Sequence, residues 1–176
     1  MRSAALFLIG ALAAAPALTA QAAPAMSRRD YQVKMLEHQR AFLLKMADSM
    51  PERLYRDKAT PAQRDFAGQI HHAAGAVSMI AAGVLKGPKP TLPDTAVAFK
   101  DRAGLRTFIN AAYDYGAELL KTQSDSARAV QVNLFGTQMP AWQVWDEIHA
   151  HTIWTAGQVV ANFRKNGMSP PAFTFF

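Results

Sequence analysis

Apolar side chains recur at steps of three and four residues along four stretches of this chain, which is the spacing of an amphipathic helix. The four stretches span residues 27–50, 61–86, 101–121 and 140–166. Helices of this length bury their apolar faces most simply against one another, around a common core. The pattern therefore predicts an all-α fold, a four-helix bundle with no sheet.

Helix-breaking residues set the expected boundaries. Pro51 ends the first helix, Thr60 and Pro61 provide an N-cap and a first-turn proline for the second, and Gly167 provides a C-terminal cap for the fourth. Residues 129–136 differ, because their apolar side chains partly alternate, as in a strand. A lone short strand would have no partner, so we expect either a loop or a lead-in to the last helix.

The N-terminus has the three parts of a secretory signal peptide. A positive start at Arg2 precedes an apolar run over residues 4–15, and a small-residue site follows at residues 20–22. An uncleaved anchor is the alternative, but a spanning helix needs ~20 apolar residues and this run is shorter. We expect residues 1–22 to be removed, which leaves one domain, residues 23–176, in the periplasm or secreted, with no stable membrane anchor.

Composition narrows the function classes. The chain of 176 residues has a formal charge of +6, but its Lys and Arg residues are scattered, which argues against a nucleic-acid partner. It has no Cys and therefore no thiol nucleophile or disulfide. Glycine-rich phosphate loops, a G-x-S-x-G elbow and an H-E-x-x-H motif are also absent. The sequence nominates no catalytic nucleophile.

Two groups of motifs resemble the DinB-like superfamily, a set of four-helix bundles that includes metal-dependent enzymes. The first group consists of residues 49–55, a loop after the first helix, and residues 69–74, which include His72. The second group consists of residues 151–158, similar to the family pattern H-x-x-x-H-x-G-Q, and residues 163–171, with an aromatic-Arg pair and a Gly before two prolines. With the helix order, this resemblance covers nearly all of residues 23–176.

The resemblance implies a divalent metal site made of three histidines, one on the second helix and two at i and i+4 on the fourth. Such a pair lies on one helical face, so both imidazoles can reach one ion. His72 and His151 match two of these positions, but Thr155 occupies the third. A neutral hydroxyl is a poor substitute for imidazole, so we expect zinc or nickel to bind weakly or not at all. Glu147, four residues before His151, is an alternative third ligand; a solvated helix edge is its simpler interpretation.

The other histidines have structural interpretations. Helical spacing places His149 on the core-facing side of the fourth helix, pointing away from His151. His38 lies among apolar residues of the first helix, and periodicity does not rank His71 against His72; only the resemblance selects His72. A polar strip beside the core face of the fourth helix is expected to contain Glu147, His151, Thr155, Gln158 and Asn162.

Three functions remain open at this point. The first is an exported DinB-like domain protein with no assigned reaction and a degenerate metal site in an inter-helix cleft. The second is a metal-dependent hydrolase or thiol-dependent transferase that uses His72, His151 and Glu147. The third is a binding module for a small molecule or a protein, and the apolar residues 173–176 suggest docking onto the bundle or onto a second copy in a homodimer.

Overall fold

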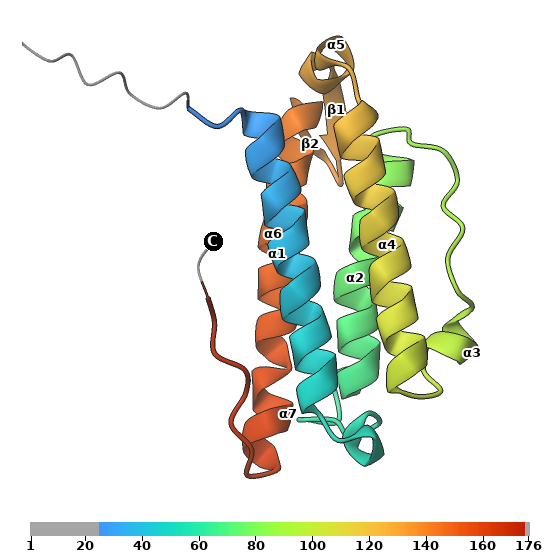
Figure 1. The fold of residues 1–176 in the computed structure, drawn as a ribbon, viewed down its shortest axis with the longest axis vertical. Helices are drawn as coiled ribbons and strands as arrows, with labels where there is room; N and C mark the ends of the chain where they lie inside the picture. Colours follow the sequence, from blue (N-terminus) through green and yellow to red (C-terminus); the bar gives the residue numbers. More distant parts are fainter. Residues whose placement is uncertain (1–24, 175–176) are drawn as a thin grey trace, which may run out of the picture.

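The computed structural model describes residues 25–174, and this part of the chain is mostly helical, in keeping with an all-α fold. Figure 1 shows its long helices running side by side along the long axis of the molecule. They are α1 (Arg28–Ser49), α2 (Phe66–Gly83), α4 (Arg102–Thr122) and α6 (Ala141–Gln158). The predicted signal peptide and the start of the mature chain at Ala23 lie outside the described residues.

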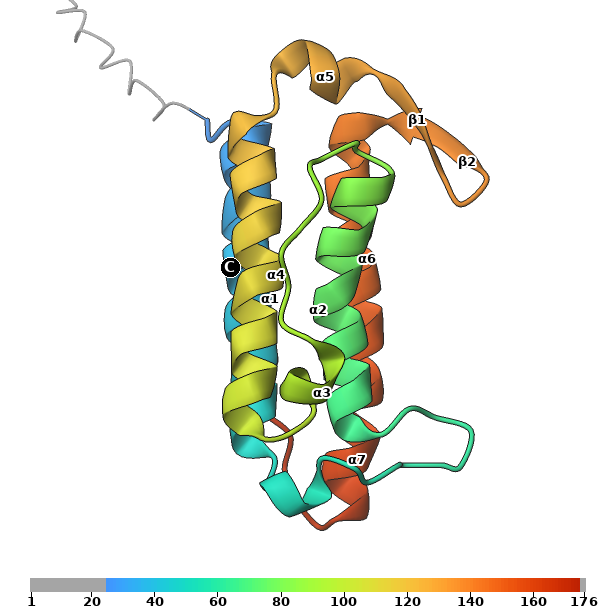
Figure 2. The same ribbon diagram turned by 90° about the vertical axis from the view of Figure 1, so that its right-hand side faces the viewer.

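Shorter elements connect the long helices or extend their ends. They are the 3-10 helix η1 (Glu52–Leu54), the helices α3 (Thr95–Ala98), α5 (Asp125–Ala129) and α7 (Val160–Lys165), and the strands β1 (Gln131–Leu134) and β2 (Thr137–Pro140). Figure 2 shows that the segment between α2 and α4 runs extended along the long helices and ends in α3. That segment covers one face of the long helices.

Side-chain caps mark where the long helices α1, α2 and α4 begin. Ser27 accepts a hydrogen bond from the Asp30 amide at 3.1 Å, so α1 starts one residue from its predicted position. The prediction for the second helix was wrong by five residues, because α2 starts at Phe66 rather than residue 61. The Asp65 carboxylate accepts a hydrogen bond from the Gly68 amide at 2.7 Å, and this cap starts the helix in place of Thr60.

The predicted fourth helix over residues 140–166 is divided into α6 and α7 at Val159. The Val159 amide bonds to the Ala156 carbonyl at 3.2 Å, a three-residue spacing that tightens the last turn of α6. The predicted cap at Gly167 is confirmed, since this residue follows α7 with a φ of 69°.

The expectation of no sheet was wrong. Strands β1 and β2 form an antiparallel hairpin in which Gln131 pairs with Pro140 and Leu134 pairs with Thr137. Its two-residue turn is Phe135 and Gly136, and both have positive φ, as this kind of turn requires. The alternating residues of β1 therefore do have a partner strand, β2, which follows directly after the turn.

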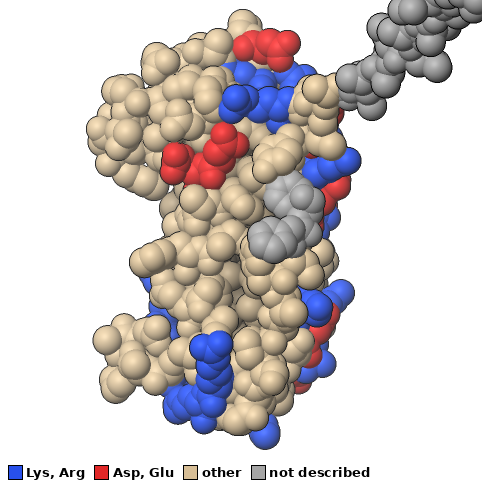
Figure 3. Space-filling model, turned by 90° about the vertical axis from the view of Figure 1, so that its left-hand side faces the viewer, with Lys and Arg blue, Asp and Glu red and all other residues tan. Residues whose placement is uncertain are grey.

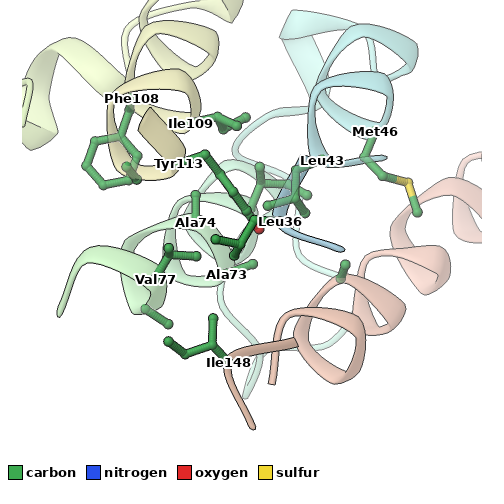
Figure 4. Packing of buried hydrophobic residues seen from close by; sticks show 14 of the residues in the cluster. Leu36, Leu43, Met46, Ala73, Ala74, Val77, Phe108, Ile109, Tyr113 and Ile148 are labelled. Atoms are coloured by element: carbon green, nitrogen blue, oxygen red, sulfur yellow. The ribbon is translucent and has the colours of Figure 1, made fainter. Parts of the chain in front are cut away.

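The long helices enclose one hydrophobic core. Helix α2 packs on α4 and α6, and α1 packs on the same two helices from the other side. In Figure 4, Tyr113 points inward from α4 toward side chains of α1 and α2. Tyr113 is fully buried, its hydroxyl lies 3.3 Å from Gln39 Oε1, and burial raises its pKa far above the usual value.

Among residues 25–174, none of the helices has an apolar stretch of the length needed for a membrane crossing.

The ring of Phe173, in the tail that was expected to dock, lies edge-on to Phe42 with centroids 6.2 Å apart, yet Phe173 remains 54% exposed. The other two tail aromatics, Phe175 and Phe176, lie outside the described residues.

The start of α4 packs directly on α3, and this contact generates a stability prediction. A Cβ atom at Gly104 would collide with the backbone carbonyl oxygen of Val97, which has no flexible side chain to move aside. We expect Gly104→Ala to lower the free energy of unfolding by about 1–3 kcal/mol, measured by urea denaturation. Gly157→Ala is the matched control, because nothing lies within 4 Å of its added Cβ, and it should be neutral or stabilising. Equal effects of the two substitutions would contradict the close contact.

Candidate functional site

The cleft between α2 and α6 brings two of the candidate residues together. His72 on α2 and His151 on α6 have ring centroids 5.2 Å apart, with an angle of 73° between the ring planes. Figure 2 shows the two helices lying next to each other along most of their length. Periodicity left His71 and His72 unranked, and the packing of α2 on α6 turns His72 toward His151.

Thr155 lies in the same cleft, one turn beyond His151. It is 2% exposed, and its Oγ1 is 3.4 Å from His151 Nε2. The neighbouring Gln69 on α2 donates from Nε2 to the Thr155 carbonyl at 3.3 Å and to Gln158 Oε1 at 3.0 Å. These bonds tie α2 to α6 beside the histidine pair and limit how far the cleft can open.

His71 has a different environment from its neighbour. Its ring stacks on Phe108, with centroids 3.9 Å apart and an interplanar angle of 26°, and Phe99 lies 4.9 Å away. Its Nε2 is buried and makes no hydrogen bond to any residue in 25–174. His71 is therefore part of an aromatic contact between α2, α3 and α4.

Burial and one nearby cation keep the histidine pair uncharged. Burial lowers the pKa of His72, and the charges of Arg64 and then His151 lower it further. Burial and Arg64 also lower the pKa of His151. Because the usual histidine pKa is about 6.5, both imidazoles are neutral at pH 7 and each offers one donor and one acceptor nitrogen.

Two cavities meet beside His72. One of about 400 Å³ has basic walls that include Arg56, Lys58 and Arg64. The other, of about 550 Å³, has mainly apolar walls that include Leu92 and Phe108. His71, His72 and Thr95 line both. The α2 side of the cleft thus continues into a hollow with one basic and one apolar part, which is the usual make-up of a small-molecule site.

The donor atoms in the cleft do not fit the three-histidine metal set that the motifs imply. His72 and His151 supply imidazole nitrogens, but the third position holds the Thr155 hydroxyl, which remains neutral at pH 7 and binds zinc or nickel poorly. The Glu147 carboxylate instead accepts a hydrogen bond from Gln143 at 3.5 Å. Within residues 25–174, no three His, Cys, Asp or Glu side chains form a group that could hold a metal ion.

The remaining predictions on α6 need correction in part. His149 was expected to face the core, but it is half-buried at the boundary with α1, while Ile148 and Thr152 are fully buried. The core face is therefore centred to one side of His149. Two members of the predicted polar strip, Thr155 and Asn162, are buried. Thr155 faces α2, whereas Asn162 lies on α7 and donates from Nδ2 to the Asp57 carbonyl at 2.9 Å.

Sequence reasoning missed two contributors to this site. Arg64 precedes α2 in a segment with no periodicity, and only the tertiary structure places its charge near both imidazoles. Gln69 lies one turn before His72 on the same helix. The three-residue spacing could have indicated that Gln69 lies beside His72, since residues three apart share a helical face.

The lowered histidine pKa values predict a pH dependence of stability. The unfolded chain has the ordinary histidine pKa, so it takes up protons before the folded chain does. The free energy of unfolding should therefore be highest above about pH 7 and fall as the pH drops toward about pH 5. His71→Phe keeps the stack on Phe108 and removes one titrating group, so it should reduce this loss while matching the wild type at about pH 8. Urea denaturation across the pH range measures both, and an unchanged acid slope in the variant would refute the assignment.

No protein-family model matches the chain, and no curated protein matches it. The described residues form a mostly helical domain that has a neutral histidine pair, a buried threonine and a partly basic hollow beside α2.

Proposed function

We propose that this chain is an exported DinB-like four-helix-bundle protein whose family metal site is degenerate and whose cleft binds a small molecule. The observation that carries the proposal is the Thr155 hydroxyl, 3.4 Å from His151 Nε2, at the position where the motif has an imidazole. The resemblance of the motifs and the order of the long helices support the family, and the N-terminal pattern supports export.

The Thr155 hydroxyl at the third ligand position favours small-molecule binding over metal catalysis as the function of the cleft. Metal-dependent hydrolysis or thiol transfer needs an ion held firmly enough to lower the pKa of a bound water or thiol. Two imidazoles hold zinc or nickel less firmly than three, and a threonine hydroxyl adds little. Neutral His72 and His151 instead offer directed hydrogen bonds to an organic ligand.

The hollow beside His72 suggests the character of that ligand. Its basic part includes Arg64, which forms no salt bridge with a described carboxylate, and suits a polar or anionic group. Its apolar part includes Leu92 and Phe108 and suits a hydrocarbon or aromatic portion. We therefore favour a small amphipathic molecule with one acidic end.

Metal titration tests the degenerate site. Wild-type protein should bind zinc or nickel weakly or not at all, and Thr155→His should raise the affinity about tenfold or more, because it supplies a third imidazole at i+4 from His151. Isothermal titration calorimetry measures both forms. The gain should disappear when His72→Ala is added to Thr155→His.

Thr155→Asn is the matched control, since it adds a polar planar group without an imidazole and should give no gain. Circular dichroism of each variant checks that the buried substitution leaves the helices intact. Tight, stoichiometric binding by the wild type would contradict the proposal. If Glu147→Gln then abolished that binding, the alternative site of His72, His151 and Glu147, with metal-dependent activity, would be favoured.

A further inference from the structure

A second hollow, separate from the histidine cleft, lies where the start of α1 meets α5 and the start of α6. It has a volume of about 460 Å³, and three arginines line it: Arg28, Arg29 and Arg128. In Figure 3, blue Lys and Arg atoms gather at the upper end of the molecule, between two groups of red Asp and Glu atoms. Three arginines therefore meet around one hollow, although Lys and Arg are scattered along the sequence.

Arg128 is the unusual member of this cluster, because it is only 6% exposed. Its Nη2 donates to Gln32 Oε1 at 2.7 Å, but its Nη1 is buried and makes no hydrogen bond to any described residue. Gln32 in turn donates to Asp146 Oδ1 at 2.7 Å and to the Trp142 carbonyl at 2.8 Å. The neutral amide of Gln32 therefore stands between the Arg128 guanidinium and the carboxylate of Asp146.

The other two arginines already have acidic neighbours. Arg28 lies over the Trp142 ring at 3.9 Å and reaches Asp146 Oδ2 at 3.6 Å. Arg29 forms an ion pair with Asp125, whose side chain is 95% exposed, and its Nε is buried without a partner among the described residues. The Asp125 carboxylate is thus held at the surface by its ion pair with Arg29, and an ion pair with so exposed a partner contributes little stability.

Asp30, the other acidic residue that lines the hollow, does not neutralise the charge of Arg128. The Asp30 carboxylate accepts a hydrogen bond from the Ser27 hydroxyl at 2.6 Å. Burial, followed by the charges of Arg29 and Arg28, lowers the pKa of Arg128, and the charges of Asp125 and Asp146 oppose this shift only in part. Residues 1–24 and 175–176 contain no Asp or Glu side chain.

A guanidinium does not lose its proton in a protein, so a buried arginine needs an anionic partner. Arg28 is matched by Asp146, which leaves Arg29 and Arg128 to share the exposed carboxylate of Asp125. If Asp125 moves into solvent, two guanidinium groups remain on one wall of the hollow. Their charge and fork-shaped donors match a phosphate dianion.

We propose that the hollow lined by Arg28, Arg29 and Arg128 is an oxyanion site that binds a phosphate group, with Asp125 as the intramolecular competitor for Arg29. The phosphate can belong to a free phosphate compound or to a phospholipid headgroup, because both present the same oxygens to the arginines. The site does not depend on the histidine cleft or on the function proposed for it.

The test uses inorganic phosphate, titrated at low ionic strength and followed by calorimetry and by amide chemical shifts. Arg29→Gln and Arg128→Gln should each weaken binding about tenfold or more, because each removes charge-assisted hydrogen bonds. Arg164→Gln is the matched control, since it removes the same charge from an exposed position on α7 and should change the affinity less than about twofold. Asp125→Asn should have the opposite effect and strengthen binding, because it removes the competing carboxylate.

A second arm uses vesicles that contain phosphatidic acid, compared with vesicles of a zwitterionic lipid alone. Binding of phosphatidic acid vesicles that is lost in Arg29→Gln and kept in Arg164→Gln identifies the lipid headgroup as the source, while binding of free phosphate alone identifies a soluble compound. The proposal is overturned if wild-type protein binds neither, or if Arg29→Gln and Arg164→Gln weaken binding equally. Should Arg128→Gln fail to fold, Arg29→Gln and Asp125→Asn, with their opposite expected effects, still decide the matter.

Discussion

The close approach of α2 to α4 and α6 is the constraint on which the rest of the structure depends. Helix α2 presents fully buried small side chains, among them Ala73 and Ala74. On α4, the added Cβ of a residue at position 116 would lie 2.6 Å from Val77 Cγ1, so only the glycine found there allows this spacing. Small residues at helix contacts bring backbones close together, and side chains at the edges of the contact then meet across it.

The histidine cleft follows directly from that approach. Because α2 lies near α6, Gln69 can reach both the Thr155 carbonyl and Gln158, and His72 can contact His151. Buried polar groups need partners with good geometry, so these bonds also favour one register of α2 on α6 over a sliding contact. The candidate site and the core are therefore one packing arrangement, and a change in the core alters the geometry of the site.

The histidine cleft and the arginine-lined hollow differ in how they accommodate the burial of basic side chains. At the cleft, burial lowers the histidine pKa values, so His72 and His151 become neutral and require no counter-ion. Arg128 cannot respond in this way, because arginine stays protonated. The first environment suits a ligand recognised by directed hydrogen bonds, and the second suits one that brings negative charge.

Local periodicity determined a large part of the fold from the sequence alone. Helices α1 and α4 begin and end within one residue of the predicted stretches, because an amphipathic helix leaves a repeated pattern in its own residues. The candidate residues His72, His151 and Thr155 came from spacing together with the motif resemblance. The hairpin was not predicted because its two-residue turn, Phe135 and Gly136, lacks the Asn-Gly or Asp-Gly pair that marks such turns most clearly in a sequence.

Only the tertiary structure decided which of these side chains meet. It turned His72 rather than His71 toward His151, moved His149 to the boundary with α1, and brought the charge of Arg64 to the histidine pair. It also joined Arg128 to Gln32, which lies 96 residues earlier in the chain. Contacts between residues so far apart leave no period and no fixed spacing in the sequence, since they depend on how whole helices pack, and packing is decided by the shapes of many side chains at once.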